Sequence, residues 1–191
     1  MAEDVPIVVG VSGASGAPIA VKVLRALRSA GVPVALVVSD GAKAVLREEC
    51  GIEPDALRAY AARTYADSDL GAPIASGSNP TRGMAIVPCS SNTVARLAMG
   101  LGDTLLLRAA HVHLKERRRL VIVPRESPLP TLLLRHLTSL SELGVVVLDA
   151  APPYYTHPAT VDDQTDYLAG KVLDHLGVEH ALYRGWRSEA T

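Results

Sequence analysis

The feature that most constrains the fold is an apolar run that leads through a glycine-rich turn into a helical pattern. The apolar run is Ile7–Val9, the turn is Gly10–Ala17, and the helical pattern extends from Pro18 to Leu27. A helix that begins after such a turn presents backbone N–H groups that favour an anionic phosphate. The glycine spacing differs from the G-x-G-x-x-G of dinucleotide sites. The turn therefore predicts a mononucleotide phosphate site, or else a tight strand-to-helix junction without a ligand.

The hydroxyl groups in this turn could also take part in chemistry. Ser12 and Ser15 lie between its glycines, and a hydroxyl can both donate and accept a hydrogen bond. We therefore expect these two side chains to donate to a phosphate or to relay protons.

The strand–helix rhythm continues along the chain and predicts an α/β fold with a parallel sheet. Further strands are expected over 32–38, 84–88, 120–124 and 145–148. Further helices are expected over 42–49, 94–99, 104–117, 129–143 and 160–176. Residues 51–83 have no strong period, so a short helix over 55–63 and a long polar loop are expected there. The inward face of the helix over 129–143 is expected to carry Leu132, Leu133, Leu137 and Leu140.

Composition limits the number of domains and the classes of partner. The chain has 191 residues, 48% of them hydrophobic, which suffices for one domain with its own core. We expect a single domain over 1–191, with a core over 5–177 and a C-terminal tail over 178–191. A net charge of −1 gives no overall attraction to nucleic acid or membrane. Because no basic, apolar leader precedes the first strand, a cytoplasmic protein with Cys50 and Cys89 reduced is expected.

Candidate site residues follow the expected strands, at the edge where parallel α/β sheets bind ligands. Ser39 follows the second strand and would either contact a ligand or cap a helix. Arg125 and Glu126 follow the strand over 120–124, and this pair is the best local candidate for chemistry. Glu49 lies near a helix end, where it could reach a ligand or be a solvated surface group.

Several cations elsewhere in the chain could serve an anionic substrate. Arg108 and Lys115 are seven residues apart, so they share one face of their helix. With Arg125 and Lys171, and with Tyr155 and Ser76, they could bind a phosphate or pyrophosphate and stabilise it as it leaves. The spacing of these residues does not decide whether they converge.

Other site classes have weaker signals. His111 and His113 are two residues apart on a helix and face apart, which argues against a metal pair. The chain has no G-x-S-x-G motif, so a hydrolytic triad is not indicated. The basic run over 115–119 lacks the interleaved aromatic residues of a nucleic-acid site.

Taken together, these segments resemble the UbiX/Pad1 family of flavin prenyltransferases, from Ile7 to Gly177. The resemblance is carried by Gly10–Ala17, Ala75–Ser78, Val87–Ser90, Arg108–Ala110, Leu114–Arg118, Val123–Pro128, Tyr155, Pro158 and Thr160–Asp163. It implies a three-layer, Rossmann-like (flavodoxin-like) sandwich that binds FMN. It also implies a homo-oligomer, which is a dodecamer in the family.

The resemblance implies a reaction as well. Reduced FMN would attack dimethylallyl phosphate, the phosphate would leave, and a second bond would close a fourth ring. The product, prenylated FMN, would pass to a UbiD-type decarboxylase, and no metal would be needed.

Site roles follow from the same resemblance, residue by residue. Flavin contacts are implied for Gly13, Ala14, Ser15, Ser39, Ser90, Thr93 and Arg125. Binding of the substrate phosphate is implied for Ser76, Gly77, Arg108, Lys115, Arg125, Tyr155 and Lys171. Glu126 and Glu49 match the acid and base positions, and Ser15 matches a proton relay.

Two departures from the family pattern and two alternative functions remain open. Leu70 stands where many relatives have a Trp that would face an allylic cation, and Trp186 is the aromatic residue that could compensate. Lys171 stands where some relatives have Arg. The run over 91–95, with Gly100 and Asp103, also resembles FMN-dependent cysteine decarboxylases. A non-catalytic flavin carrier or an accessory subunit of a decarboxylase is the other alternative.

Overall fold

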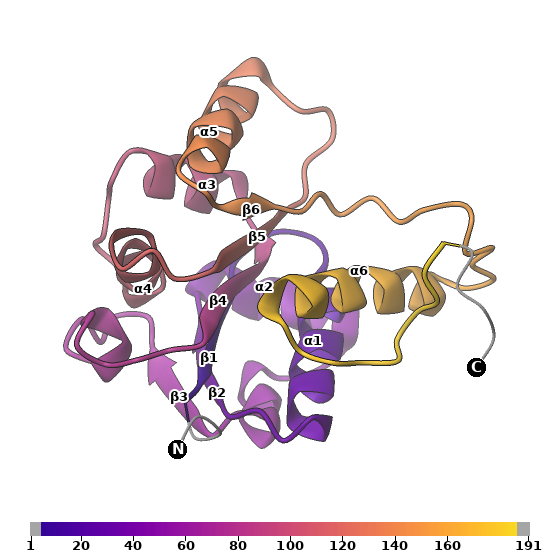
Figure 1. The fold of residues 1–191 in the computed structure, drawn as a ribbon, viewed down its shortest axis with the longest axis horizontal. Helices are drawn as coiled ribbons and strands as arrows, with labels where there is room; N and C mark the ends of the chain where they lie inside the picture. The colour runs from indigo at the N-terminus through magenta and orange to yellow at the C-terminus, as the bar shows by residue number, and fades with distance from the viewer. Residues whose placement is uncertain (1–4, 187–191) are drawn as a thin grey trace.

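Six strands form one parallel sheet in the computed structural model, which describes residues 5–186 (Figure 1). The strands are β1 (Ile7–Val11), β2 (Val34–Val38), β3 (Arg63–Ala66), β4 (Gly83–Cys89), β5 (Leu120–Pro124) and β6 (Val146–Val147). Their order across the sheet is β3-β2-β1-β4-β5-β6. The direction in which the strands are added therefore reverses between β1 and β4. Open parallel sheets bind ligands at such a point, beyond the carboxyl ends of the strands.

Helices cover both faces of the sheet and make a three-layer sandwich, as expected. One face is covered by α1 (Ala17–Ser29), α2 (Asp40–Cys50), α6 (Val161–Leu176) and the 3₁₀ helix η1 (Pro54–Tyr60). The other face is covered by α3 (Ser91–Ala98), α4 (Leu105–Lys115), α5 (Thr131–Glu142) and the 3₁₀ helix η2 (Pro73–Ala75). Helices α4 and α6 therefore lie in opposite layers (Figure 1).

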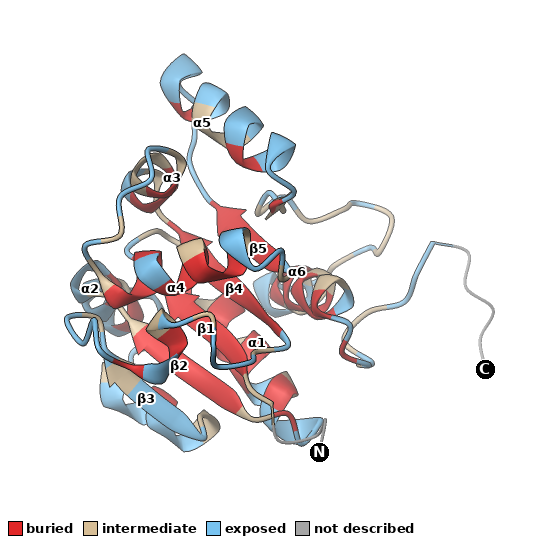
Figure 2. Cartoon of the chain, turned by 60° about the vertical axis from the view of Figure 1, so that its left-hand side comes forward, coloured by how far each residue is buried: buried red, intermediate tan, exposed pale blue. Residues whose placement is uncertain are grey.

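The two layers pack on two separate hydrophobic cores, one on each face of the sheet. Alternate residues of a strand point to opposite faces, so Val9 of β1 packs with the α1 layer and Val8 with the α4 layer. Strands β1, β4 and β5 are buried along their whole length, which explains their continuous apolar sequence (Figure 2). The carboxyl ends of these strands are thereby held at one rigid edge.

Expectations about local structure are wrong in two segments, which are residues 55–66 and helix α5. The expected polar loop contains strand β3, and the helix expected over 55–63 is the 3₁₀ helix η1, which ends at Tyr60. Strand β3 is short and mostly exposed, so it has no apolar run, and it is held by pairing from Arg63 opposite Ala35 to Ala66 opposite Val38. The polar character of the segment reflects its place at the edge of the sheet.

The second error concerns the inward face of α5. Leu133 and Leu140 are buried and Leu137 is partly buried, but Leu132 is 63% exposed. Helix α5 lies beyond the centre of the sheet and packs mainly on α3, so only a narrow stripe of it is covered (Figure 2). The rest of the apolar surface of α5 is exposed.

The segment after α6 folds back on the domain. Val178 is buried in the same core as α6. Residues 187–191 of the expected tail and the acidic residues 1–4 lie outside the described residues. Within residues 5–186 we find no helix whose length and apolar character would let it cross a membrane.

Candidate active site

A cavity of about 650 Å³ lies at the carboxyl edge of the sheet, across the point where the strand order reverses. The turns after β1, β2, β4 and β5 and the first turn of α4 form its walls. Its volume is within the range of roughly 300–1,000 Å³ that is usual for small-molecule sites. The topology therefore places one ligand-sized cavity where the sequence turns meet.

All seven residues predicted to contact flavin line this cavity, and Glu126 lies beside them. The seven are Gly13, Ala14, Ser15, Ser39, Ser90, Thr93 and Arg125. They come from four turns that are far apart in the sequence. The structure thus brings this predicted set together within one chain.

Two of the serines in the cavity begin helices. The Ser39 hydroxyl accepts a hydrogen bond from the backbone N–H of Ala42 (3.3 Å), and the Ser90 hydroxyl accepts one from that of Thr93 (3.2 Å). Both are therefore N-caps, of α2 and α3 respectively. A capping hydroxyl keeps its own O–H to donate, so capping and ligand contact do not exclude each other.

Ser12 has a structural role, and the expectation that it serves a phosphate or relays protons is wrong. It is 2% exposed, and its hydroxyl donates to the carbonyl of Pro88 (3.0 Å) and accepts from the N–H of Ser90 (2.7 Å). These bonds join the end of β1 to the end of β4 and hold the strands together beneath the cavity.

A glycine pair brings the turns after β1 and β2 into direct contact. A Cβ placed on Gly13 would lie 2.9 Å from the backbone carbonyl carbon of Gly41. Real Cβ atoms do not approach backbone so closely, so only hydrogen fits there. The two turns therefore form one continuous wall of the cavity.

Glu49 caps the start of α1, a role that the sequence did not predict for this residue. Its Oε2 accepts from the backbone N–H groups of Gly16 (2.8 Å) and Ala17 (2.9 Å). These two N–H groups are therefore not free for the phosphate expected at the start of this helix, because a carboxylate accepts from both. The sequence could not reveal this contact, since Glu49 approaches from another helix.

The electrostatics of Glu49 keep it ionised. Burial alone would raise the pKa of Glu49, but hydrogen bonds from Ser15, Gly16 and Ala17 and the charge of Arg125 hold it below its usual value. Ser15 both lines the cavity and bonds to Glu49. It therefore provides a polar link between the cavity and this carboxylate.

Arg125 and Glu126 leave the end of β5 on the exposed rim of the cavity. The Glu126 carboxylate accepts a hydrogen bond from the Ser91 hydroxyl (2.9 Å) through Oε2, and Oε1 accepts from the N–H of Ser127 (3.2 Å). Each oxygen has a further lone pair that is free for a proton. This geometry suits an acid–base group beside a cation.

Asp67 was not found from the sequence, although it lines the cavity. Its side chain accepts from the N–H of Leu106 (2.9 Å), and its backbone carbonyl accepts from that of Leu105 (2.7 Å). It thereby fixes the first turn of α4 against the cavity. Asp67 follows β3 directly, so recognising that strand is the signal that would have found it.

The seven residues predicted to bind the substrate phosphate lie in three separate places of the folded chain, which answers the question of convergence that their spacing left open: one chain does not bring them all together. Arg125 lies at the cavity. Arg108, Lys115, Ser76 and Gly77 lie on α4 and the loop after η2, whereas Tyr155 and Lys171 lie on the α6 side of the sheet. Lys115 ends α4, about 15 Å along the helix from the turn that borders the cavity.

Each of the two outlying groups has its own contacts. On the α4 side, Lys115 Nζ lies 2.5 Å from Glu116 Oε1. On the α6 side, Lys171 Nζ lies 3.3 Å from Asp174 Oδ2, and the Tyr155 ring lies 5.0 Å from that of Trp186.

The two neighbouring histidines of α4 have different surroundings. His111 bonds the carbonyl of Leu101 (3.0 Å), whereas His113 is buried and bonds the carbonyl of Ala109 (2.7 Å). Among the described side chains we find no group of three or more His, Cys, Asp or Glu that could hold a metal ion.

Comparison with known proteins identifies the family. The Flavoprotein family model matches residues 1–172. The chain is 48% identical over 180 residues to the flavin prenyltransferase UbiX of Thermoplasma acidophilum, covering 94% of this chain and 99% of the relative. The chain belongs to the UbiX flavin prenyltransferase family. The sequence resemblance to that family is confirmed.

Two solved structures of UbiX proteins share the fold over almost the whole chain. AnUbiX (PadA1), in complex with FMN and dimethylallyl pyrophosphate, has a TM-score of 0.94 and 37% identity, covering 97% of this chain and 99% of that one. A dodecameric FMN-dependent UbiX-like decarboxylase from Escherichia coli O157:H7 has a TM-score of 0.93 and 41% identity, covering 96% and 100%. The expected fold class is therefore confirmed.

Proposed function

We propose that this protein is a flavin prenyltransferase that joins the dimethylallyl group of dimethylallyl phosphate to reduced FMN, giving prenylated FMN. The observation that carries the proposal is the single cavity in which all seven expected flavin contacts meet Glu126. Membership of the UbiX family supports it, and it does not favour a cysteine decarboxylase or a non-catalytic flavin carrier.

The lining of the cavity fits FMN. Leu106 and Leu107 give an apolar wall on which a flat ring system can pack. Serine and threonine hydroxyls, with the guanidinium of Arg125, give polar groups for the phosphate and the ring edges. When bound, the reduced flavin supplies the nucleophile that displaces the substrate phosphate and then closes a fourth ring.

Protons are handled by two carboxylates that reach the cavity in different ways. Glu126 stands on the rim and transfers a proton directly. Glu49 is not among the residues that line the cavity but is hydrogen-bonded to Ser15, which does line it, so the Ser15 hydroxyl relays the proton to it. The protein thus contributes positioning, charge and proton transfer.

A complete phosphate site needs more than one copy of the chain. Since Lys115 and Lys171 lie in opposite layers, we propose that neighbouring copies bring them to the cavity that holds Arg125. The assembly is a homo-oligomer, a dodecamer as in the UbiX-like relative.

The apolar surface around α5 supports assembly. Figure 2 shows that much of α5 is exposed, and several exposed residues of α5, of the positions that flank it and of the C-cap of α3 are large and apolar. They are Leu129 (48% exposed), Leu132 (63%), Leu134 (45%), Leu143 (66%) and Met99 (69%). Contact with other copies would cover this surface.

Three further aspects complete the proposal. The chain is one flavoprotein domain over 1–191, it works in the cytoplasm, and it hands its product to a UbiD-type decarboxylase.

The test is anaerobic incubation with reduced FMN and dimethylallyl phosphate, followed by mass spectrometry of the flavin. A flavin heavier by one C5 unit is the expected product. Heat-denatured protein and oxidised FMN are the controls. Unchanged FMN in the presence of both substrates would reject the proposed activity and would leave the carrier alternative.

A further inference from the structure

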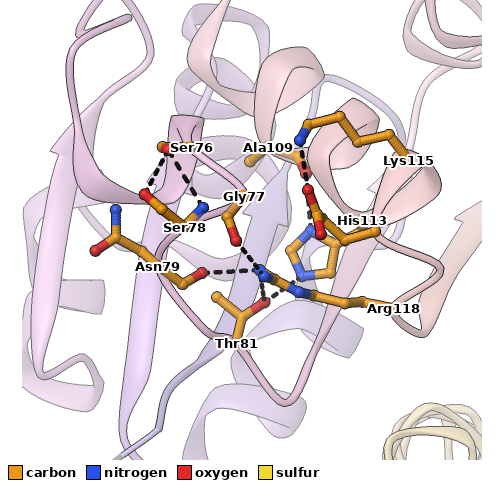
Figure 3. A network of polar contacts seen from close by, with 10 residues as sticks. Ser76, Gly77, Ser78, Asn79, Thr81, Ala109, His113, Lys115 and Arg118 are labelled. Atoms are coloured by element: carbon orange, nitrogen blue, oxygen red, sulfur yellow. Dashed lines mark hydrogen bonds and ion pairs between the residues drawn. The ribbon is translucent and has the colours of Figure 1, made fainter.

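Arg118, the last residue of the Lys-Glu-Arg-Arg run, connects α4 to the loop that carries Ser76 and Gly77 (Figure 3). One guanidinium nitrogen donates to the carbonyl of Gly77 (2.6 Å). The other donates to the carbonyl of Asn79 (2.8 Å) and to the Thr81 hydroxyl (3.3 Å). A planar guanidinium can reach three acceptors at once, whereas an ammonium group cannot keep this geometry.

His113 fixes the far end of this network. Its Nδ1 lies 2.7 Å from the carbonyl of Ala109, which can only accept, so Nδ1 carries the proton. Burial is the main cause that lowers the pKa of His113; backbone hydrogen bonds at Ala109 and Gly83 oppose this effect and the Arg118 charge reinforces it. The ring is therefore neutral, and its Nε2 accepts from the Thr81 hydroxyl (2.8 Å).

The Thr81 hydroxyl is therefore both a hydrogen-bond donor and a hydrogen-bond acceptor. Its hydroxyl donates to His113 and accepts from Arg118, so the bonds run in one sequence from Arg118 to the Ala109 carbonyl (Figure 3). Because His113 is fully buried, this sequence anchors Arg118 to the body of α4.

The anchored loop lies directly against Lys115. A Cβ placed on Gly77 would lie 2.6 Å from Lys115 Nζ and would also overlap the Glu116 carboxylate. Next to Gly77, the hydroxyls of Ser76 and Ser78 lie 2.8 Å apart. The side chain of Arg118 therefore sets the distance between the Ser76–Gly77 backbone and the Lys115 ammonium group.

We propose that Arg118, braced by Thr81 and His113, is a positioning residue that holds Ser76 and Gly77 beside Lys115, so that these three bind the substrate phosphate together. The inference rests on the proposed function, since it takes the dimethylallyl phosphate to bind at these three residues. Arg118 itself contacts protein carbonyls and a hydroxyl, and its effect reaches the phosphate through the loop.

The test compares Arg118→Lys with Arg117→Lys, two neighbouring substitutions that both keep the charge. Arg117 is exposed, whereas Arg118 is half-buried in the network. Calorimetry with dimethylallyl phosphate on protein loaded with oxidised FMN measures binding without turnover, and steady-state assays measure KM and kcat. We expect Arg118→Lys to raise both the Kd and the KM for dimethylallyl phosphate about tenfold, with kcat within about twofold. Arg117→Lys should match the wild type.

A second readout follows the loop itself. Amide hydrogen exchange over 76–81 should be faster in Arg118→Lys than in the wild type or Arg117→Lys, and the Kd for FMN should be unchanged. Thr81→Val removes the bracing hydroxyl and keeps all charges. It should also speed amide exchange over 76–81 and raise the KM for dimethylallyl phosphate, but by less than Arg118→Lys does. It also serves as the test variant if Arg118→Lys does not fold.

Five outcomes decide the role of Arg118. Weaker substrate binding, seen as a higher Kd and KM with kcat and FMN affinity unchanged, together with faster amide exchange over 76–81, supports the positioning role. Unchanged Kd and KM overturn it, and so does an equal loss of FMN affinity, which would indicate general destabilisation. If the wild type binds dimethylallyl phosphate but forms no prenylated flavin, the proposed function fails and the binding data still decide the role of Arg118. A wild type that does not bind dimethylallyl phosphate overturns both.

Discussion

The cavity at the carboxyl edge and the outlying cations on α4 and α6 are assembled by different means. The cavity is made from turns, and a parallel sheet brings the carboxyl ends of its strands to one edge however far apart they are in sequence. Lys115 and Lys171 instead project from helices in opposite layers. Sheet topology can therefore bring the predicted flavin contacts together within one chain, whereas Lys115 and Lys171 lie on opposite faces of the sheet and would meet at one phosphate only in the proposed assembly of copies.

The largest effect is expected at Glu126, which tests whether the chemistry belongs to the cavity. Glu126→Gln keeps the size and the hydrogen-bond acceptor and removes the proton-transfer group, so kcat should fall about 100- to 10,000-fold. FMN affinity, measured by fluorescence titration, should stay within about threefold. Glu142→Gln, an exposed carboxylate on α5, is the matched control. Normal turnover in Glu126→Gln would remove this residue from the mechanism.

Complementation between two variants tests whether Arg125 and Lys171 reach one phosphate site from different copies of the chain. Arg125→Met and Lys171→Met should each lower kcat/KM about 100-fold, since each removes a cation from the phosphate site. When the two variants are co-assembled in equal amounts, about a quarter of the sites would receive both wild-type residues if these come from different copies. Turnover of unfolded and refolded mixtures measures this recovery. No recovery would show that the two residues serve the site from the same copy.

A smaller effect is expected from Lys115 alone. Lys115→Met keeps much of the apolar stem and removes one charged donor, so the KM for dimethylallyl phosphate should rise about 10- to 100-fold. The FMN affinity should not change, because Lys115 is assigned to the substrate phosphate and does not line the flavin cavity of its own chain. Lys43→Met, on the exposed surface of α2, is a suitable control. An unaltered KM would contradict the assignment of Lys115 to the phosphate.

The smallest effect concerns the stability of the cavity wall. The pKa of Glu49 is held below its ordinary value of 4.5, so its capping bonds stabilise the fold above that pH and are lost as pH falls through the lowered pKa. At pH 7, Glu49→Ala should lower Tm by about 2–4 °C relative to Glu48→Ala, and this difference should shrink below pH 4.5. Calorimetric scans across pH measure it. A difference independent of pH would reject the electrostatic account.

Local signals in the sequence predicted the parts of the site that depend on local structure. Ser39 and Ser90 each follow a buried strand and begin a helix, and such a position was readable from residue type and pattern. Lys115 and Lys171 were candidate phosphate-binding cations from residue type, and the family resemblance also assigned them to one phosphate site. Neither source indicated that these two lie in opposite layers, because pattern and resemblance carry no three-dimensional arrangement.

The errors share a physical cause. Strand β3 is held by backbone pairing at the sheet edge and not by apolar side chains, so periodicity missed it and Asp67 with it. Glu49 accepts from the N-cap of a helix, Gly16, which lies 33 residues earlier, and Arg118 reaches carbonyls 39 and 41 residues away. Such contacts depend on the folded arrangement, which no local pattern encodes.

The close approach of Gly13 and Gly41 has a consequence for mutagenesis surveys of this enzyme. Any side chain at Gly13 pushes against the backbone of the neighbouring turn before it meets a ligand. Inactive variants at this position will therefore be frequent in a saturation library without reporting on chemistry. Position 13 marks a limit on how near two polypeptide segments can lie, and a directed-evolution effort should leave it alone.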